Sequence, residues 1–187
     1  AYSTIASEDS SSVKSRLAHR SPADLVLAED ESWLATANET SNSVSLVHPR
    51  TGQVLDEIAV GSHPTSITLC LDGKHLLVSC SHSGEVRLLE VQDKRLIEKA
   101  NIHVGFEPTG MAVTSDGRRA FVGLAAASEV TEVDLVAAQV SRRIAVGKWP
   151  RYLALTPDDS RLAVGCSGEH KIVVVDVKSG SAIYEEG

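Results

Sequence analysis

Side chains that could bind a ligand recur in two kinds of loop along this 187-residue chain. One kind precedes a repeated proline and contains histidine, glutamate, lysine and tryptophan, with an arginine just after the last proline. The other kind contains a second histidine. Cationic groups bind anions, and an aromatic ring between them could stack on an anionic or sugar-like ligand. The residues predicted to bind a ligand are His63, His82, Glu107, Lys148, Trp149 and Arg151.

A purely structural interpretation of these residues stays open. Trp149 could cover the junction between two repeats, with the cations on either side solvated. The seven histidines suggest a metal or haem hypothesis, but no two of them have a metal-ligand spacing, and the chain has no Cys-x-x-Cys-His sequence for covalent haem. We therefore predict no metal and no cofactor in this segment.

Local signatures of catalysis are also absent from the sequence. It contains no Gly-x-Ser-x-Gly, no phosphate-binding loop, no Gly-x-Gly-x-x-Gly and no His-Glu-x-x-His. Serine, histidine and aspartate are plentiful, but without such a motif they do not indicate a catalytic site. The sequence favours a segment without catalytic activity.

The two kinds of loop belong to one repeat, which defines the fold. Prolines at positions 22, 64, 108 and 150 each open a run of short apolar segments separated by turn sequences. Three of these prolines complete a Val-Gly-x-x-Pro motif, at residues 60–64, 104–108 and 146–150. A repeat of about 40 to 45 residues with only strand signals is typical of a β-propeller blade. We predict an all-β fold, a β-propeller of four-stranded antiparallel blades with four blades visible.

The repeat also predicts where each blade begins and ends. A polar N-terminal segment, residues 1–20, comes first, and its residues 13–20 could form an outer strand. The blades are predicted at residues 21–61, 62–105, 106–147 and 148–187. The second blade has two extra residues before Ile102, where we expect a bulge or a longer loop.

An open row of four blades would leave apolar faces at both ends. Either the four blades are part of a larger ring, or they close on themselves or on a second copy. We favour the larger ring, because propellers with this repeat length commonly have six to eight blades.

Composition excludes some classes of partner. The net charge is −7, and nonspecific nucleic-acid binding needs a basic surface instead. No apolar run approaches the roughly 20 residues that span a bilayer. The three cysteines match no zinc pattern. We interpret them as free, buried packing residues.

The first blade contains Ala-Thr-Ala-Asn at residues 35–38, a Thr-Gly turn at 51–52 and Ile-Ala-Val-Gly-Ser-His-Pro at 58–64. In these residues the chain resembles the YVTN-family β-propeller repeat. The resemblance covers residues 22–187, although the Tyr-Val-Thr-Asn tetrad is degraded and its asparagine remains only at Asn38. The resemblance implies a bacterial or archaeal protein acting outside the cytoplasm, at the cell surface or in the periplasm.

Three functions are compatible with this resemblance. The first is a non-catalytic scaffold that binds a partner protein or a small ligand on the face where both kinds of loop emerge. The second is the propeller portion of an extracytoplasmic redox protein associated with a c-type cytochrome or haem domain. Further blades or such a domain could then lie in the same chain or a partner chain. The third is a lactonase-like hydrolase.

Overall fold

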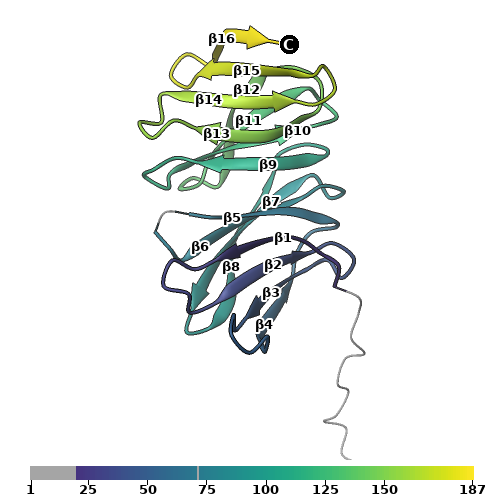
Figure 1. The fold of residues 1–187 in the computed structure, drawn as a ribbon, viewed down its shortest axis with the longest axis vertical. Helices are drawn as coiled ribbons and strands as arrows, with labels where there is room; N and C mark the ends of the chain where they lie inside the picture. The colour runs from purple at the N-terminus through teal and green to yellow at the C-terminus, as the bar shows by residue number, and fades with distance from the viewer. Residues whose placement is uncertain (1–19, 71) are drawn as a thin grey trace, which may run out of the picture.

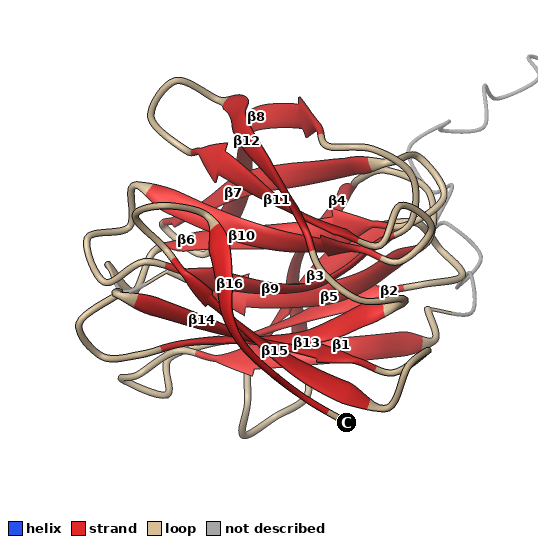
Figure 2. Cartoon of the chain, turned by 90° about the horizontal axis from the view of Figure 1, so that it is seen from above, coloured by secondary structure: helices blue, strands red, loops and turns tan. Residues whose placement is uncertain are grey.

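The computed structural model describes residues 20–70 and 72–187, and all of its regular structure there is β-strand (Figures 1 and 2). The strands form four separate four-stranded antiparallel sheets, each made of four consecutive strands. The predicted all-β propeller architecture is confirmed. The strand predicted within residues 13–20 falls almost wholly outside the described residues. Within the described part, no helix is long and apolar enough to cross a membrane.

Each sheet is a blade whose first strand lies nearest the axis and whose fourth lies at the outer edge. The first blade contains β1 (Pro22–Leu27), β2 (Leu34–Asn38), β3 (Ser43–Val47) and β4 (Val54–Ala59). The second contains β5 (Pro64–Leu69), β6 (His75–Cys80), β7 (Glu85–Gln92) and β8 (Arg95–His103). The third contains β9 (Pro108–Val113), β10 (Arg119–Leu124), β11 (Glu129–Asp134) and β12 (Gln139–Ala145). The fourth contains β13 (Pro150–Leu155), β14 (Arg161–Cys166), β15 (Lys171–Asp176) and β16 (Ser181–Glu186).

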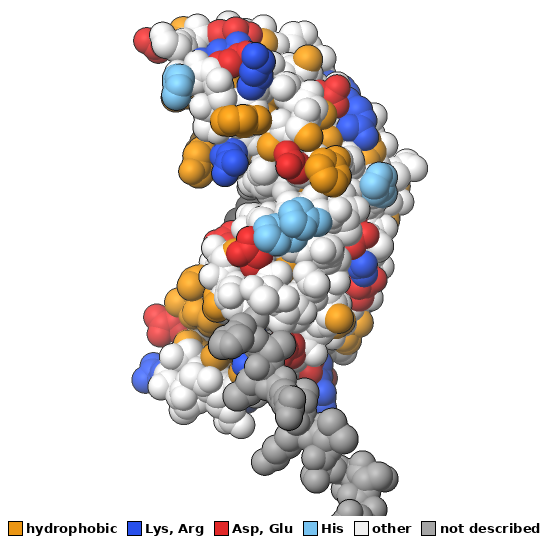
Figure 3. Space-filling model, turned by 90° about the vertical axis from the view of Figure 1, so that its right-hand side faces the viewer, with side chains coloured by type: hydrophobic (Ala, Val, Ile, Leu, Met, Phe, Trp, Pro, Cys, Tyr) orange, Lys and Arg blue, Asp and Glu red, His pale blue; other side chains and the backbone are white. Residues whose placement is uncertain are grey.

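Alternation along the strands gives every blade two faces. We call the face turned toward the following blade the forward face, and the opposite one the backward face. Three apolar clusters fill the three junctions, each combining the forward face of one blade with the backward face of the next. Phe121 on β10 is the largest fully buried side chain and lies in the last of these clusters. The four blades form a curved row that does not close into a ring, so the body is hollowed on one side (Figures 1 and 3).

Polar side chains reinforce the junctions at the ends and edges of the strands. The Asp24 carboxylate in the first blade accepts hydrogen bonds from the Ser66 hydroxyl and the Ile67 amide in the second, both at 3.0 Å. At the outer edge, the Arg142 guanidinium of the third blade donates to the carbonyl oxygen of Val177 in the fourth, at 2.7 Å. These bonds satisfy backbone groups that would otherwise lose water when the blades pack.

The two extra residues of the second blade are accommodated by longer strands, which corrects the expected bulge or longer loop. β7 and β8 gain the pairs Val91↔Leu96 and Gln92↔Arg95 and end in a two-residue turn. Both turn residues, Asp93 and Lys94, have positive φ, as a tight hairpin with this twist requires. A register shift does occur between β7 and β8, but every blade has one between its third and fourth strands.

The three cysteines are free and buried, as predicted. Burial raises the pKa of the Cys70 and Cys80 thiols to about 12, because a thiolate is disfavoured away from water. Both therefore remain protonated at neutral pH and act as small apolar groups.

The turn between the third and fourth strands has one residue in the left-handed region in the first, third and fourth blades. The residue is Gly52, Ala138 or Gly180, with φ between 53° and 72°. We expect Ala138→Gly to stabilise the protein by about 0.5–1 kcal/mol, because it removes the strain of a Cβ at positive φ. Gly52→Ala, where a Cβ meets no atom within 4 Å, should cost a similar amount. Urea unfolding of both variants measures the two changes, and effects of the same sign would contradict this explanation.

The turn between the first and second strands repeats an aspartate, at positions 30, 72, 116 and 158, whose carboxylate accepts backbone hydrogen bonds. Hydroxyl hydrogen bonds, first from Thr156 and then from Ser160, lower the pKa of Asp158 to about 2. Since this folded-state pKa lies below the unfolded value near 4, its contribution to stability is present above about pH 4 and lost toward pH 2.

We expect Asp158→Asn to lessen the fall in melting temperature between about pH 4 and pH 2. The asparagine oxygen can accept the same hydrogen bonds without titrating. Thermal melts of both proteins across this range provide the measurement, and identical slopes would show that Asp158 contributes nothing to acid sensitivity.

Candidate functional site

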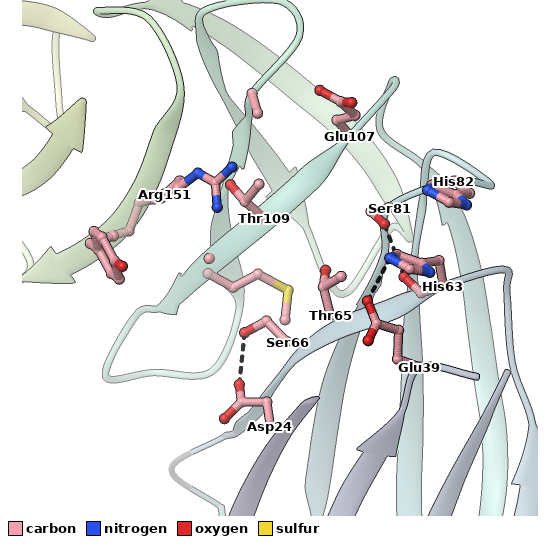
Figure 4. A pocket seen from close by; sticks show the side chains of 15 residues that line it. Asp24, Glu39, His63, Thr65, Ser66, Ser81, His82, Glu107, Thr109 and Arg151 are labelled. Carbon is pink, nitrogen blue, oxygen red and sulfur yellow. Dashed lines mark hydrogen bonds and ion pairs between the residues drawn. The ribbon is translucent and has the colours of Figure 1, made fainter. Parts of the chain in front are cut away.

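The hollow side of the row contains a cavity of about 680 Å³ at one end of the inner strands (Figure 4). Residues from all four blades line it, so groups far apart in the sequence share one space. The polar and charged residues around it are Asp24, Glu39, His63, Thr65, Ser66, Ser81, His82, Glu107, Thr109 and Arg151.

The residue before each repeated proline is held in the left-handed region of backbone space. Ser21, His63, Glu107 and Trp149 have φ values of 45°, 59°, 54° and 55°. This conformation is uncommon for residues other than glycine, and a following proline ordinarily favours extended backbone. We call these four positions the pre-proline positions.

A backbone hydrogen bond ties each pre-proline position to a turn of its own blade. The carbonyl oxygen of His63 accepts from the Ser81 amide at 2.9 Å, and that of Glu107 accepts from the Ala125 amide at 3.0 Å. Equivalent bonds join Glu39 to Ser21, at 3.0 Å, and Ser167 to Trp149, at 3.1 Å. The bond uses the backbone only, so the side chain is left to face the cavity or solvent.

The glycine of the Val-Gly-x-x-Pro motif is required by close packing. A Cβ placed on Gly61 would lie 2.8 Å from the Cβ of Cys80, and one on Gly147 would lie 2.8 Å from the Cβ of Cys166. The Gly147 amide also donates to the Cys166 sulfur at 3.3 Å. The loop that enters the inner strand can therefore lie directly against the second strand of the same blade.

Two histidines and a glutamate form an array at one end of the cavity. The rings of His63 and His82 are stacked, with centroids 4.0 Å apart and an angle of 3° between their planes. The Nε2 atom of His63 lies 2.6 Å from the Oε1 atom of Glu39. Asn42 holds the backbone of His63 from the preceding blade, because its Oδ1 accepts from the His63 amide at 2.8 Å.

Arg151 lies at the opposite end of the cavity (Figure 4). It is exposed, and the ion pairs among the described residues include none to its guanidinium. Its backbone approaches Gly110 so closely that a Cβ there would lie 2.2 Å from the Arg151 carbonyl oxygen. The Thr109 hydroxyl donates to the carbonyl oxygen of Pro150 at 2.6 Å, which holds β13 against β9.

The structure brings together four of the six predicted ligand-binding residues: His63, His82, Glu107 and Arg151. Lys148 and Trp149 do not line the cavity. Trp149 occupies a pre-proline position, but it lies beside the turn at Gly168, where a Cβ would meet its ring at 3.1 Å. The predicted wall with Trp149 between two cations is therefore not part of this cavity.

Sequence reasoning did not select Glu39 and Asp24, which also line the cavity. Glu39 is the repeat equivalent of Ser81, so aligning the second kind of loop could have identified it. Asn38, the residue that carries the resemblance, braces this loop from beneath. It is buried, its Nδ2 donates to Ser43 and Ser45 at 3.1 and 2.8 Å, and its Oδ1 accepts from Thr36 at 2.9 Å.

In the described part of the chain, no group of three or more histidine, cysteine, aspartate or glutamate side chains is arranged so that it could hold a metal ion. The chemistry available in the cavity is recognition of an anion by Arg151, hydrogen bonding by carboxylates and hydroxyls, and proton transfer by histidine.

Comparison with known proteins supports the fold. No family model matches the sequence, and no curated protein does. Among solved structures, hydrazine synthase from Kuenenia stuttgartiensis superimposes with a TM-score of 0.81 at 24% identity, over 96% of this chain and 52% of that one. A structure described as a putative 6-phosphogluconolactonase from Bacteroides uniformis superimposes with a TM-score of 0.71 at 15% identity, and the match covers 86% of this chain and 52% of that one. The chain thus spans about half the length of each, and at these identities the likeness shows the fold alone.

Proposed function

We propose that this chain is a propeller module that binds a small polyhydroxylated carboxylate, such as a sugar acid, in the cavity at the hollow side of the blades. The observation that carries the proposal is the Arg151 guanidinium, which lies at one end of a 680 Å³ cavity without a carboxylate partner among the described residues. A guanidinium presents paired donors that match a carboxylate.

The other end of the cavity suits the hydroxyl groups of such a ligand. The carboxylates of Glu39 and Glu107 can accept hydrogen bonds from ligand hydroxyls, and His82 lines the same cavity. Tyr152 adds an exposed aromatic wall next to Arg151. A cavity of this size falls in the usual range for small-molecule sites. The location outside the cytoplasm expected from the repeat remains part of this proposal.

A second candidate is a lactone-hydrolysing enzyme, and two observations favour it. One is the structural likeness to the putative 6-phosphogluconolactonase. The other is the pairing of His63 Nε2 with Glu39 at 2.6 Å, because a carboxylate that orients an imidazole is the arrangement in which a histidine acts as a general base. Water attack on the lactone carbonyl would break the ring ester bond and yield the hydroxy acid that Arg151 is proposed to hold. The alternative role in a haem-associated redox protein stays a prediction.

Isothermal titration calorimetry with gluconate tests the binding proposal. We expect binding that Arg151→Ala weakens by about 10- to 100-fold, which corresponds to the loss of one charge-assisted interaction. The matched control is Lys148→Ala, which removes a cation of the same loop outside the cavity and should leave affinity unchanged. Equal losses of affinity in both variants would show that the protein's overall charge, and not a contact with Arg151, determines binding. No loss of affinity in either variant would refute the proposed site.

A pH-stat assay with gluconolactone tests the second candidate. If His63 is a general base, the wild-type protein should accelerate ring opening above the spontaneous rate, and His63→Ala should lose about 100-fold or more of the acceleration. Glu39→Gln should shift the pH profile of the reaction, because it changes the partner of the imidazole. Gluconate binding without turnover supports the binding module alone.

A further inference from the structure

The forward face of the fourth blade is an unpartnered sheet face at the end of the row. Along the repeat, Val44, Val86 and Val130 occupy one position on the third strand, and each is fully buried against the next blade. Ile172 occupies the same position in the fourth blade and is 54% exposed. The interface that joins the first three blades to their successors is therefore present here without an occupant among the described residues.

Two other strands of the fourth blade also expose side chains at positions that contact the next blade elsewhere in the row. Tyr152 on the inner strand is the equivalent of Asp24, whose carboxylate binds the following blade, and Tyr152 is 73% exposed. Tyr184 on the outer strand is the equivalent of Arg142, which also reaches the following blade, and it is 52% exposed. Three strands thus present large apolar side chains at positions that elsewhere contact a neighbour.

The opposite end of the row presents the complementary half of this interface. Leu25 on β1 is the equivalent of Ile67 and Met111, which are 3% and 8% exposed because they pack on the preceding blade. Leu25 itself is 55% exposed, and Leu27 is 46% exposed. The polar residues on that face, Thr36, Asn38, Ser43 and Ser45, are already buried and hydrogen-bond to one another through Asn38, so the part left for a partner is the inner strand with Leu25 and Leu27.

We propose that two copies of this chain close into one eight-bladed ring, with the forward face of each fourth blade packed on the backward face of the partner's first blade. One chain carries both halves of the interface. A two-fold axis that coincides with the central axis of the ring would therefore form two identical interfaces, one at each end of the row. The chain covers 52% of the length of each of the two solved structures described above, so two copies together match the length of one such chain. The inference does not depend on the proposed ligand.

Ring closure would also complete the cavity. Tyr152 belongs both to the cavity wall and to the free forward face. In the ring, the partner's first blade would stand beside Tyr152 as the second blade stands beside Asp24. Each cavity would then gain a wall on its open side.

Sedimentation equilibrium of the 187-residue chain over a wide range of concentration tests this inference. We expect a single dimer of twice the 19.9 kDa chain mass. Ile172→Asp and Leu25→Asp should each raise the dimer Kd by more than about 100-fold, because either would bury a carboxylate against apolar side chains. Both positions are exposed in the single chain, so each variant should keep the wild-type far-UV circular dichroism spectrum.

The matched control is Val136→Asp, at an apolar residue that is 78% exposed in the turn between β11 and β12 and lies on neither end face. It should leave the dimer intact. A monomer at every concentration would overturn the inference. So would a dimer that Ile172→Asp abolishes but Leu25→Asp leaves intact, because the two fourth blades would then be packed on each other. A ladder of larger oligomers would also overturn it, because the interface would then fail to close.

Discussion

The hydrogen bond from a turn amide to the carbonyl of each pre-proline residue is the interaction on which the rest of this structure depends. It appears in all four blades, at Ser21, His63, Glu107 and Trp149, with lengths between 2.9 and 3.1 Å. It holds a residue in a conformation that costs of order 1 kcal/mol or more. This conformation directs the chain from the outer edge of one blade to the inner strand of the next, and it places two of the four side chains, those of His63 and Glu107, in the wall of the cavity.

Packing around this bond explains the repeated motif. The glycine of Val-Gly-x-x-Pro allows the loop to touch the second strand, where Cys80 or Cys166 leaves just enough room. The valine before it closes the apolar junction, as Val104 does in the second cluster. The proline can occupy the first position of the inner strand although it has no backbone N–H to donate. Each motif residue thus has a separate steric or hydrogen-bonding role, which is why the motif marks the blades so regularly.

Much of the fold follows from sequence patterns, because alternation and turn residues act locally. The prolines and the repeated turn aspartates mark the strands of each blade, and the free cysteines follow from their spacing. The site is harder to predict, because it depends on side-chain direction. Trp149 has the same backbone as His63 but lies against the turn at Gly168, where the absence of a side chain leaves space. The left-handed backbone at His63 also runs against the usual preference before proline, so no local rule indicates it.

Because the hydrogen bond shared by all four pre-proline residues uses only the main chain, the side chain at this position can change without disturbing the architecture. The four blades already display serine, histidine, glutamate and tryptophan at this one location. Evolution can therefore sample new recognition chemistry around the axis while the frame is inherited intact. Such a scaffold separates the selection for folding from the selection for specificity, and each can proceed at its own pace.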